Sequence, residues 1–233
     1  MSHFTVAVLH RPDQSIDELL APYDEGLKVD RYVEFTRQQA IDYVRKNNAR
    51  MADKSDDECW QFFTEGYDRD MVDEEGNLYT TYNPQSRWDW WVVGGRWSGL
   101  LRLKDGTTVD SARIVDIDFS PRKAQYKACL RFWDVVVDHQ PAGPDENYFS
   151  IYTEDYFRQY YVDRETYARH MTQFSTYAVV LPTGEWVQKG QMGWWGVSSE
   201  TPDEAKAWED NYMERFIEGQ DPELVLTVVD CHI

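Results

Sequence analysis

The sequence contains few cysteines, and their spacing forms no recognisable pattern. Its 233 residues include only Cys59, Cys129 and Cys231. An odd number of widely separated cysteines excludes a paired disulfide framework and the ligand spacing of a zinc ribbon. We therefore expect free thiols in a reducing compartment, the cytoplasm.

Long apolar runs and an N-terminal leader are also missing. No run reaches the roughly 18 apolar residues that a membrane-spanning helix requires. The apolar start is short, has no basic leader and meets Arg11-Pro12 within a few residues, so it does not match a secretory signal peptide. We expect no membrane association.

Basic residues are scarce. The chain carries 24 Lys and Arg against 42 Asp and Glu, which gives a formal net charge of −18. Because affinity for nucleic acid depends on clustered basic side chains, this balance excludes a broad nucleic-acid surface. The acidity is typical of a solvated surface, and an alternative is an acidic decoy protein that imitates a phosphate backbone.

The order of apolar patterns predicts one α+β domain over residues 1–233. We expect a mainly antiparallel sheet with the terminal strands, Phe4 to Leu9 and Leu224 to Ile233, at its centre and helices packed mostly on one face. Other strands are predicted at 88–93, 100–103, 107–109, 113–119, 176–181 and 186–189. Helices are predicted after Ser15, Thr36, Ser55, Ser120-Pro121, Thr153 and Thr201, the Thr153 helix with a joint at Asp163.

The richest stretch runs from Asn83 to Gly99, where four tryptophans surround Gly94-Gly95-Arg96. Glycines allow a backbone to approach a ligand, arginine can bind a carboxylate or phosphate, and indole rings stack on flat groups. A second aromatic loop, Gly190 to Gly196, can close the other side of such a pocket. The candidate ligand-binding residues are Trp88, Asp89, Trp91, Gly94, Gly95, Arg96, Trp97, Trp194 and Trp195. In the alternative interpretation the tryptophans form the core and the glycines admit only the protein's own backbone.

The two chain ends supply candidate catalytic residues. His3 and His232 lie on the terminal strands, and Asp230 shares a strand face with His232. If the terminal strands are neighbours, these side chains and that of Cys231 gather at one edge as an acid/base pair or a metal site. The alternative is that they are polar strand ends without a chemical role.

Two other patterns point weakly to chemistry. His3-Phe-Thr5 and His170-Met-Thr172 match the His-x-Thr triplets of two-histidine phosphodiesterases, although His170 lies in a helical pattern. Asp116 and Asp118 alternate on a predicted strand and are candidate ligands for a divalent cation, or simply a solvated face. The sequence contains no Walker loop, Rossmann fingerprint or nucleophile elbow, so the cofactor is unknown.

Several short motifs occur together in this chain: Met1-Ser-His-Phe-Thr-Val6, Leu20-Ala-Pro-Tyr-Asp24, Asn83-Pro, Trp88-Asp-Trp90, Gly94-Gly-Arg-Trp97, Gly190 with Met192-Gly-Trp-Trp-Gly196, and Val229-Asp-Cys-His232. Together they resemble a family of hypothetical proteins from phage and bacterial genomes. The resemblance implies a phage or prophage accessory protein, acting in the host cytoplasm if phage-encoded, and implies no particular activity. We therefore predict binding of a small anionic or nucleotide-like ligand, or of a host protein, through the Trp/Gly/Arg surface. The alternatives are a metal-dependent or two-histidine phosphoesterase and an acidic interaction protein.

Overall fold

A computed structural model describes residues 2–193 and 197–233. Backbone contacts divide the chain into two compact units: unit 1 comprises Met1–Ala21 and Trp88–Ile233, and unit 2 comprises Pro22–Arg87. The α+β class is confirmed by a mixed sheet with accompanying helices. The single domain over residues 1–233 stays a prediction, and each unit is described by itself.

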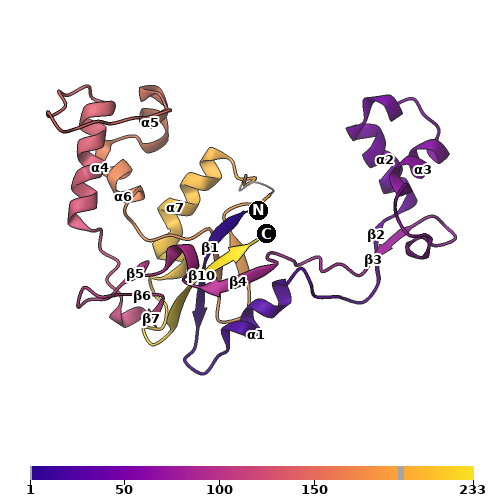
Figure 1. The fold of residues 1–233 in the computed structure, drawn as a ribbon, viewed down its shortest axis with the longest axis horizontal. Helices are drawn as coiled ribbons and strands as arrows, with labels where there is room; N and C mark the ends of the chain where they lie inside the picture. Colours follow the sequence, from indigo (N-terminus) through magenta and orange to yellow (C-terminus); the bar gives the residue numbers. More distant parts are fainter. Residues whose placement is uncertain (1, 194–196) are drawn as a thin grey trace. The chain divides into compact units, whose positions relative to one another are not determined.

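The sheet of unit 1 is built around the two terminal strands, as the sequence predicts (Figure 1). β1 (His3–His10) pairs with β10 (Val225–His232) antiparallel along its whole length, from His3 opposite His232 to His10 opposite Val225. The strand order is β4-β10-β1-β8-β9, and β7 also pairs with β10. All pairings are antiparallel except the parallel pair β1 and β8. The other strands of this sheet are β4 (Trp90–Val93), β7 (Ser111–Arg113), β8 (Ala178–Val180) and β9 (Trp186–Gln188).

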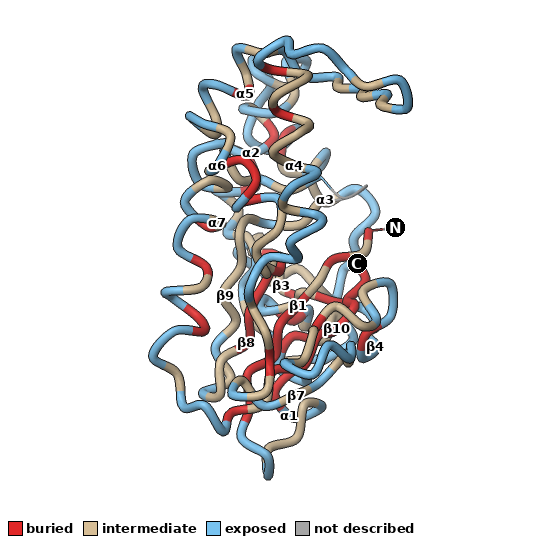
Figure 2. The backbone as a smooth tube through the Cα atoms, turned by 90° about the vertical axis from the view of Figure 1, so that its left-hand side faces the viewer, coloured by how far each residue is buried: buried red, intermediate tan, exposed pale blue. Residues whose placement is uncertain are grey.

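Both faces of the central strands are covered, which explains their nearly continuous apolar sequence (Figure 2). On one face, Ala7, Leu9 and Val228 belong to a buried cluster with Trp208 and Tyr212 of α7 (Pro202–Phe216). On the other face, the ring of Phe4 meets Tyr177 and Trp186 edge to face. Because side chains alternate along a strand, His3 and Thr5 share the α7 face with Ala7.

Three helices of unit 1 share an aromatic core of their own. α4 (Lys123–Val136), α5 (Glu154–Tyr161) and α6 (Arg164–His170) bury Trp133, Phe157 and Tyr167 together. The predicted joint is confirmed, since Val162 has a positive φ of 71° and Asp163 caps α6. Tyr156 and Tyr161 pack against the same core.

The chain between Leu101 and Arg122 differs from the prediction in two places. The hairpin at Asp105-Gly106 is confirmed, joining β5 (Leu101–Arg102) to β6 (Thr108–Val109). The predicted strand 113–119 is wrong, because the chain leaves β7 at Arg113 and forms the 3-10 helix η5 (Ile114–Asp116). There the Arg113 guanidinium bonds the Asp116 carboxylate three residues on, a spacing that suits a turn. α4 also begins later than the helix start predicted at Ser120-Pro121, since Arg122 is its N-cap and Lys123 its first residue.

Unit 2 combines two capped helices with a small sheet. Both predicted capping boxes are present: Thr36 with Gln39 opens α2 (Arg37–Asn47), and Ser55 with Glu58 opens α3 (Asp56–Thr64). Its core is the cluster of Ile41, Val44, Cys59, Met51, Trp60 and Phe63. The sequence analysis missed β2 (Tyr32–Phe35) and β3 (Leu78–Thr80). These strands pair antiparallel, and their register shifts between Val33 and Phe35. The short 3-10 helices are η1 (Ala21–Tyr23), η2 (Ala49–Met51) and η3 (Arg69–Met71).

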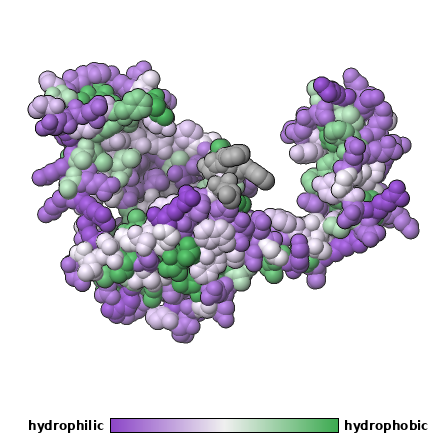
Figure 3. Space-filling view, viewed as in Figure 1, coloured by the Kyte–Doolittle hydropathy of each residue, from purple (hydrophilic) through white to green (hydrophobic). Residues whose placement is uncertain are grey.

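Hydrophilic residues cover most of the surface of each unit in the view of Figure 3. In the part of the chain that the structure describes, every helix is too short or too polar to cross a membrane.

Candidate functional site

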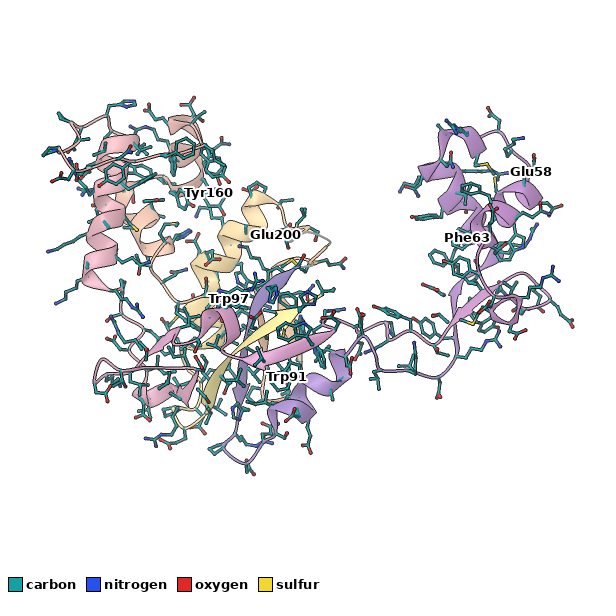
Figure 4. The ribbon with its side chains drawn as sticks, viewed as in Figure 1. Glu58, Phe63, Trp91, Trp97, Tyr160 and Glu200 are labelled. Atoms are coloured by element: carbon teal, nitrogen blue, oxygen red, sulfur yellow. The ribbon has the colours of Figure 1, made fainter. Side chains whose placement is uncertain are left out.

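The tryptophans of the central stretch have different roles. Trp88 is buried, and its indole N–H donates to the carbonyl of Leu20 at 3.2 Å, so it belongs to the core of unit 1. Trp91 lies on β4 opposite Cys231, on the sheet face away from His3. Trp97 lies on the 3-10 helix η4 (Gly95–Trp97) that follows β4 (Figure 4).

The two glycines adjoin the protein's own carboxylates. Gly94 and Gly95 have φ values of 72° and 53°, which favour glycine. A Cβ at Gly94 would lie 2.5 Å from Oδ2 of Asp110, and one at Gly95 would lie 2.5 Å from Cβ of Asp230. The backbone N–H of Arg96 donates to Asp230 Oδ2 at 3.0 Å. The space that these glycines leave is therefore occupied by two carboxylate side chains of the protein itself, whereas the alternative interpretation expected its backbone there.

The side chains after the glycines line a cavity of about 470 Å³. Arg96 and Trp97 reach it from η4, Arg102 from β5 and Arg122 from the start of α4. The other described residues that line it are Ser98, Gly99, Leu100, Leu101, Ile117, Asp118, Phe119, Ser120, Gln125, Met171, Thr172, Gln173 and Phe174.

The lining of this cavity is positively charged. Asp118 is its single acidic residue among those described, against the three arginines. Arg102 bonds Asp118 at 2.7 Å and also Ser120, while its Nε is buried without a hydrogen-bond partner. Hydrogen bonds from Ser120 chiefly hold the pKa of Asp118 below its ordinary value, with a smaller effect from Arg102. Within the described residues, the guanidinium groups of Arg96 and Arg122 form no ion pair.

Aromatic rings and a helix end complete the cavity. Phe119 and Phe174 meet edge to face with centroids 5.6 Å apart, and Trp97 packs against the same core. α4 has 14 residues, and its N-cap Arg122 makes no side-chain capping bond. The first N–H groups of such a helix carry partial positive charge and favour an anion.

The terminal histidines lie side by side at the end of the sheet, as the sequence predicts. His3 Nδ1 lies 2.8 Å from Asp230 Oδ1, and the ring centroids of His3 and His232 are 5.0 Å apart. His232 Nδ1 lies 2.6 Å from Oδ1 of Asp89, a residue that the sequence analysis had assigned to the ligand pocket. Trp90 stacks on His232 with an interplanar angle of 15°.

The remaining candidate residues, Asp116, Asp118 and His170, each pair with a different partner and form no shared site. Asp116 pairs with Arg113, while Asp118 pairs with Arg102, so the two carboxylates bind different arginines. His170 lies on α6, where its Nε2 contacts Asp210 on α7. Among the described residues, no group of three or more His, Cys, Asp or Glu side chains is placed to hold a metal ion.

The second aromatic loop is described only up to Gly193 and again from Val197. Ser2 Oγ donates to the carbonyl of Gly193 at 3.4 Å, which brings this loop to the N-terminal end of β1. Trp194 and Trp195 lie outside the described residues.

Sequence reasoning found Arg96 and Trp97 but missed Arg102, Arg122, Phe119 and Phe174. Arg102 lies on β5, Arg122 is the N-cap of α4 and the two phenylalanines lie in connecting segments, so no local pattern joins them. The uncapped helix start at Ser120-Pro121-Arg122 was the available signal. Comparisons with protein-family models, curated proteins and solved structures found no match for this chain.

Proposed function

We propose that the protein binds a small anionic ligand with a flat group, such as a nucleotide, in the cavity beside η4. The observation that carries this proposal is the gathering of Arg96, Arg102 and Arg122 around one cavity in a chain with a formal net charge of −18. Most basic side chains in such a chain are expected to pair with its abundant carboxylates. Among the described residues, Arg96 and Arg122 form no ion pair, which supports an external anion as their partner.

Size and chemistry support the same ligand class. A volume of about 470 Å³ lies in the range of small-molecule sites, roughly 300–1,000 Å³. Arg96 and Arg122 can bind phosphate or carboxylate oxygens in a fork geometry. The rings of Trp97, Phe119 and Phe174 supply an apolar wall for a base or another flat group.

Calorimetric titration with AMP, pyrophosphate and inorganic phosphate tests the proposal. We expect AMP to bind more tightly than phosphate, and Arg96→Gln and Arg122→Gln each to weaken AMP binding about tenfold or more, the effect of losing a charged hydrogen bond. Binding should also weaken at high salt, because these arginines are partly exposed.

Arg113→Gln is the matched control, since Arg113 lies outside the cavity and pairs with Asp116 and Glu223. It should leave AMP binding unchanged. Absence of heat with every probe, or equal affinity in the Arg96→Gln variant and the unaltered protein, contradicts the proposal. Action as a phage accessory protein, binding of a host protein and an acidic decoy role stay predictions.

A further inference from the structure

The second feature that points to chemistry is the pair of aspartate-bound histidines at the end of the sheet. His3 and His232 are opposite each other in the register of β1 and β10, so both project from the face shared with α7. Each ring places Nδ1 against a carboxylate, Asp230 for His3 and Asp89 for His232. The arrangement therefore consists of two His–Asp pairs, one beside the other.

The carboxylates fix which ring nitrogen is available. An ionised carboxylate only accepts hydrogen bonds, so Nδ1 of each histidine carries the proton and donates it. In the neutral ring, Nε2 then has a free lone pair. Within the described residues, Nε2 of His3 and Nε2 of His232 make no hydrogen bond. Each ring can thus accept a proton at Nε2 when neutral and donate one there when protonated.

The supporting contacts hold the two pairs rigidly. Asp230 has only 2% of its side chain exposed, and it accepts the Arg96 N–H at 3.0 Å in addition to the His3 ring. The absence of a side chain at Gly95 makes room for this carboxylate. A buried carboxylate that is itself held by a second hydrogen bond keeps a catalytic histidine in one orientation, because it leaves the ring little freedom to turn.

Trp90 provides a place for a flat substrate beside the histidines. Its ring stacks on His232, meets His3 edge to face at 5.5 Å, and remains 43% exposed. Exposed indole rings of this kind stack on nucleobases.

The neighbouring groups favour direct displacement over a covalent intermediate. Cys231 projects to the opposite face, is fully buried, and has its thiol pKa raised by burial. The Thr5 hydroxyl on the histidine face accepts a hydrogen bond from the Tyr177 N–H and, among the described residues, makes no hydrogen bond to either ring. The two rings are consequently the groups placed to move protons here.

We propose that His3 and His232 form a general acid–base pair that hydrolyses small phosphodiesters of nucleotides, positioned by Asp230 and Asp89. This activity does not depend on ligand binding beside η4. In the reaction, the oxygen of a water molecule bonds to phosphorus while its proton passes to Nε2 of the neutral ring. The bond from phosphorus to the leaving oxygen breaks, and that oxygen takes the proton from Nε2 of the protonated ring. One diester and one water give one phosphomonoester and one alcohol, and proton exchange with solvent resets the rings.

The test is hydrolysis of a 2′,3′-cyclic nucleotide and of bis(p-nitrophenyl) phosphate by the full chain in the presence of EDTA. We expect both probes to be cleaved, and His3→Gln and His232→Gln each to lower kcat/KM by about 100-fold or more. The double variant should be nearly as slow as either single variant, because the two rings act as a unit.

Two further variants separate catalysis from folding. Asp89 is partly exposed, so Asp89→Asn should leave the melting temperature and KM unchanged while kcat falls about tenfold or more. His139→Gln is the matched control: His139 also contacts a carboxylate, that of Glu154, but on an exposed loop of the same unit, and its loss should not alter the rate.

Inertness of the folded protein toward both probes overturns the proposal. So does an unchanged rate in the His3→Gln and His232→Gln variants, or complete loss of activity in EDTA, which would assign the chemistry to a bound metal. A loss of kcat in Asp89→Asn that is accompanied by an equal loss in His139→Gln would also overturn the assigned positioning role.

Discussion

At the residue scale, single side chains decide what the Trp/Gly/Arg stretch can do. Gly95 has no side chain where Asp230 needs space, and the Arg96 N–H holds that carboxylate in place. The Arg96 side chain meanwhile lines the cavity beside η4. The η4 turn thus binds Asp230, the partner of His3, through the backbone N–H of Arg96, and it lines the cavity with the side chains of Arg96 and Trp97.

Replacing Gly95 with alanine should therefore destabilise unit 1. Its φ of 53° already disfavours a Cβ, and the new atom would lie 2.5 Å from Cβ of Asp230. We expect a loss of about 1–3 kcal/mol in the free energy of unfolding, measured by denaturant titration. Gly106→Ala is the control, because Gly106 also has a positive φ of 90° but nothing lies within 4 Å of its added Cβ. Equal losses in both variants would show that the contact with Asp230 has no effect.

At the element scale, side-chain bonds to backbone groups hold the loop after α4. Glu146 accepts hydrogen bonds from Arg131 on α4 and from the Gly143 N–H. These bonds, that of Arg131 foremost, lower the pKa of Glu146 to about 2. The Glu146 carboxylate therefore holds the loop from Pro141 to Tyr148 on the helix, together with the bond from Arg131 to the Pro141 carbonyl.

The pH dependence of this fastening has a definite sign. A carboxyl group whose pKa falls on folding contributes stability above its unfolded value, near pH 4.5, and loses it as the pH drops toward about 2. We expect Glu146→Gln to lower the melting temperature at pH 7 and the difference from the unaltered protein to shrink between pH 4.5 and 2. A difference that stays constant over this range would contradict the role of the carboxylate. Glu165→Gln, at an exposed position of α6, is the control.

At the scale of the whole molecule, unit 2 is an insertion in unit 1. The chain leaves unit 1 after Ala21 and returns at Trp88. The indole of Trp88 bonds the carbonyl of Leu20, so the two points lie close together within unit 1. Each unit also has its own buried cluster.

We therefore expect unit 1 to fold after residues 22–87 are replaced by a short Gly/Ser linker. The shortened chain should unfold cooperatively on heating and keep its near-UV circular dichroism, because the sheet and α7 remain intact. A shortened chain without a cooperative transition would show that unit 1 needs unit 2. Replacing Trp88 with alanine as well should destabilise the shortened chain, since it removes the contact that closes the junction.

The helix starts and the central strands could be predicted because their causes are local. Capping boxes such as Thr201 with Glu204 satisfy N–H groups within one turn, and strands buried on both faces carry continuous apolar runs. The approach of His3 to Asp230 and His232 followed from one assumption, that the terminal strands pair. The strand over 113–119 failed because the chain turns into η5 after Arg113, where the N–H groups of Ile114 and Val115 bond the carbonyls of Leu224 and Pro222, distant partners that alternation does not record.

The sequence alone determined the α+β class and the terminal strands, because patterns within single segments carry these features, whereas the gathering of His3, Asp230 and His232 followed only once those two strands were assumed to pair. Only the tertiary structure decided that Asp89 orients His232, that Asp230 fills the space at Gly95, and that Arg102 and Arg122 join Arg96 around one cavity. These contacts link residues far apart in the chain, so their partners depend on how the elements pack, which no local pattern records.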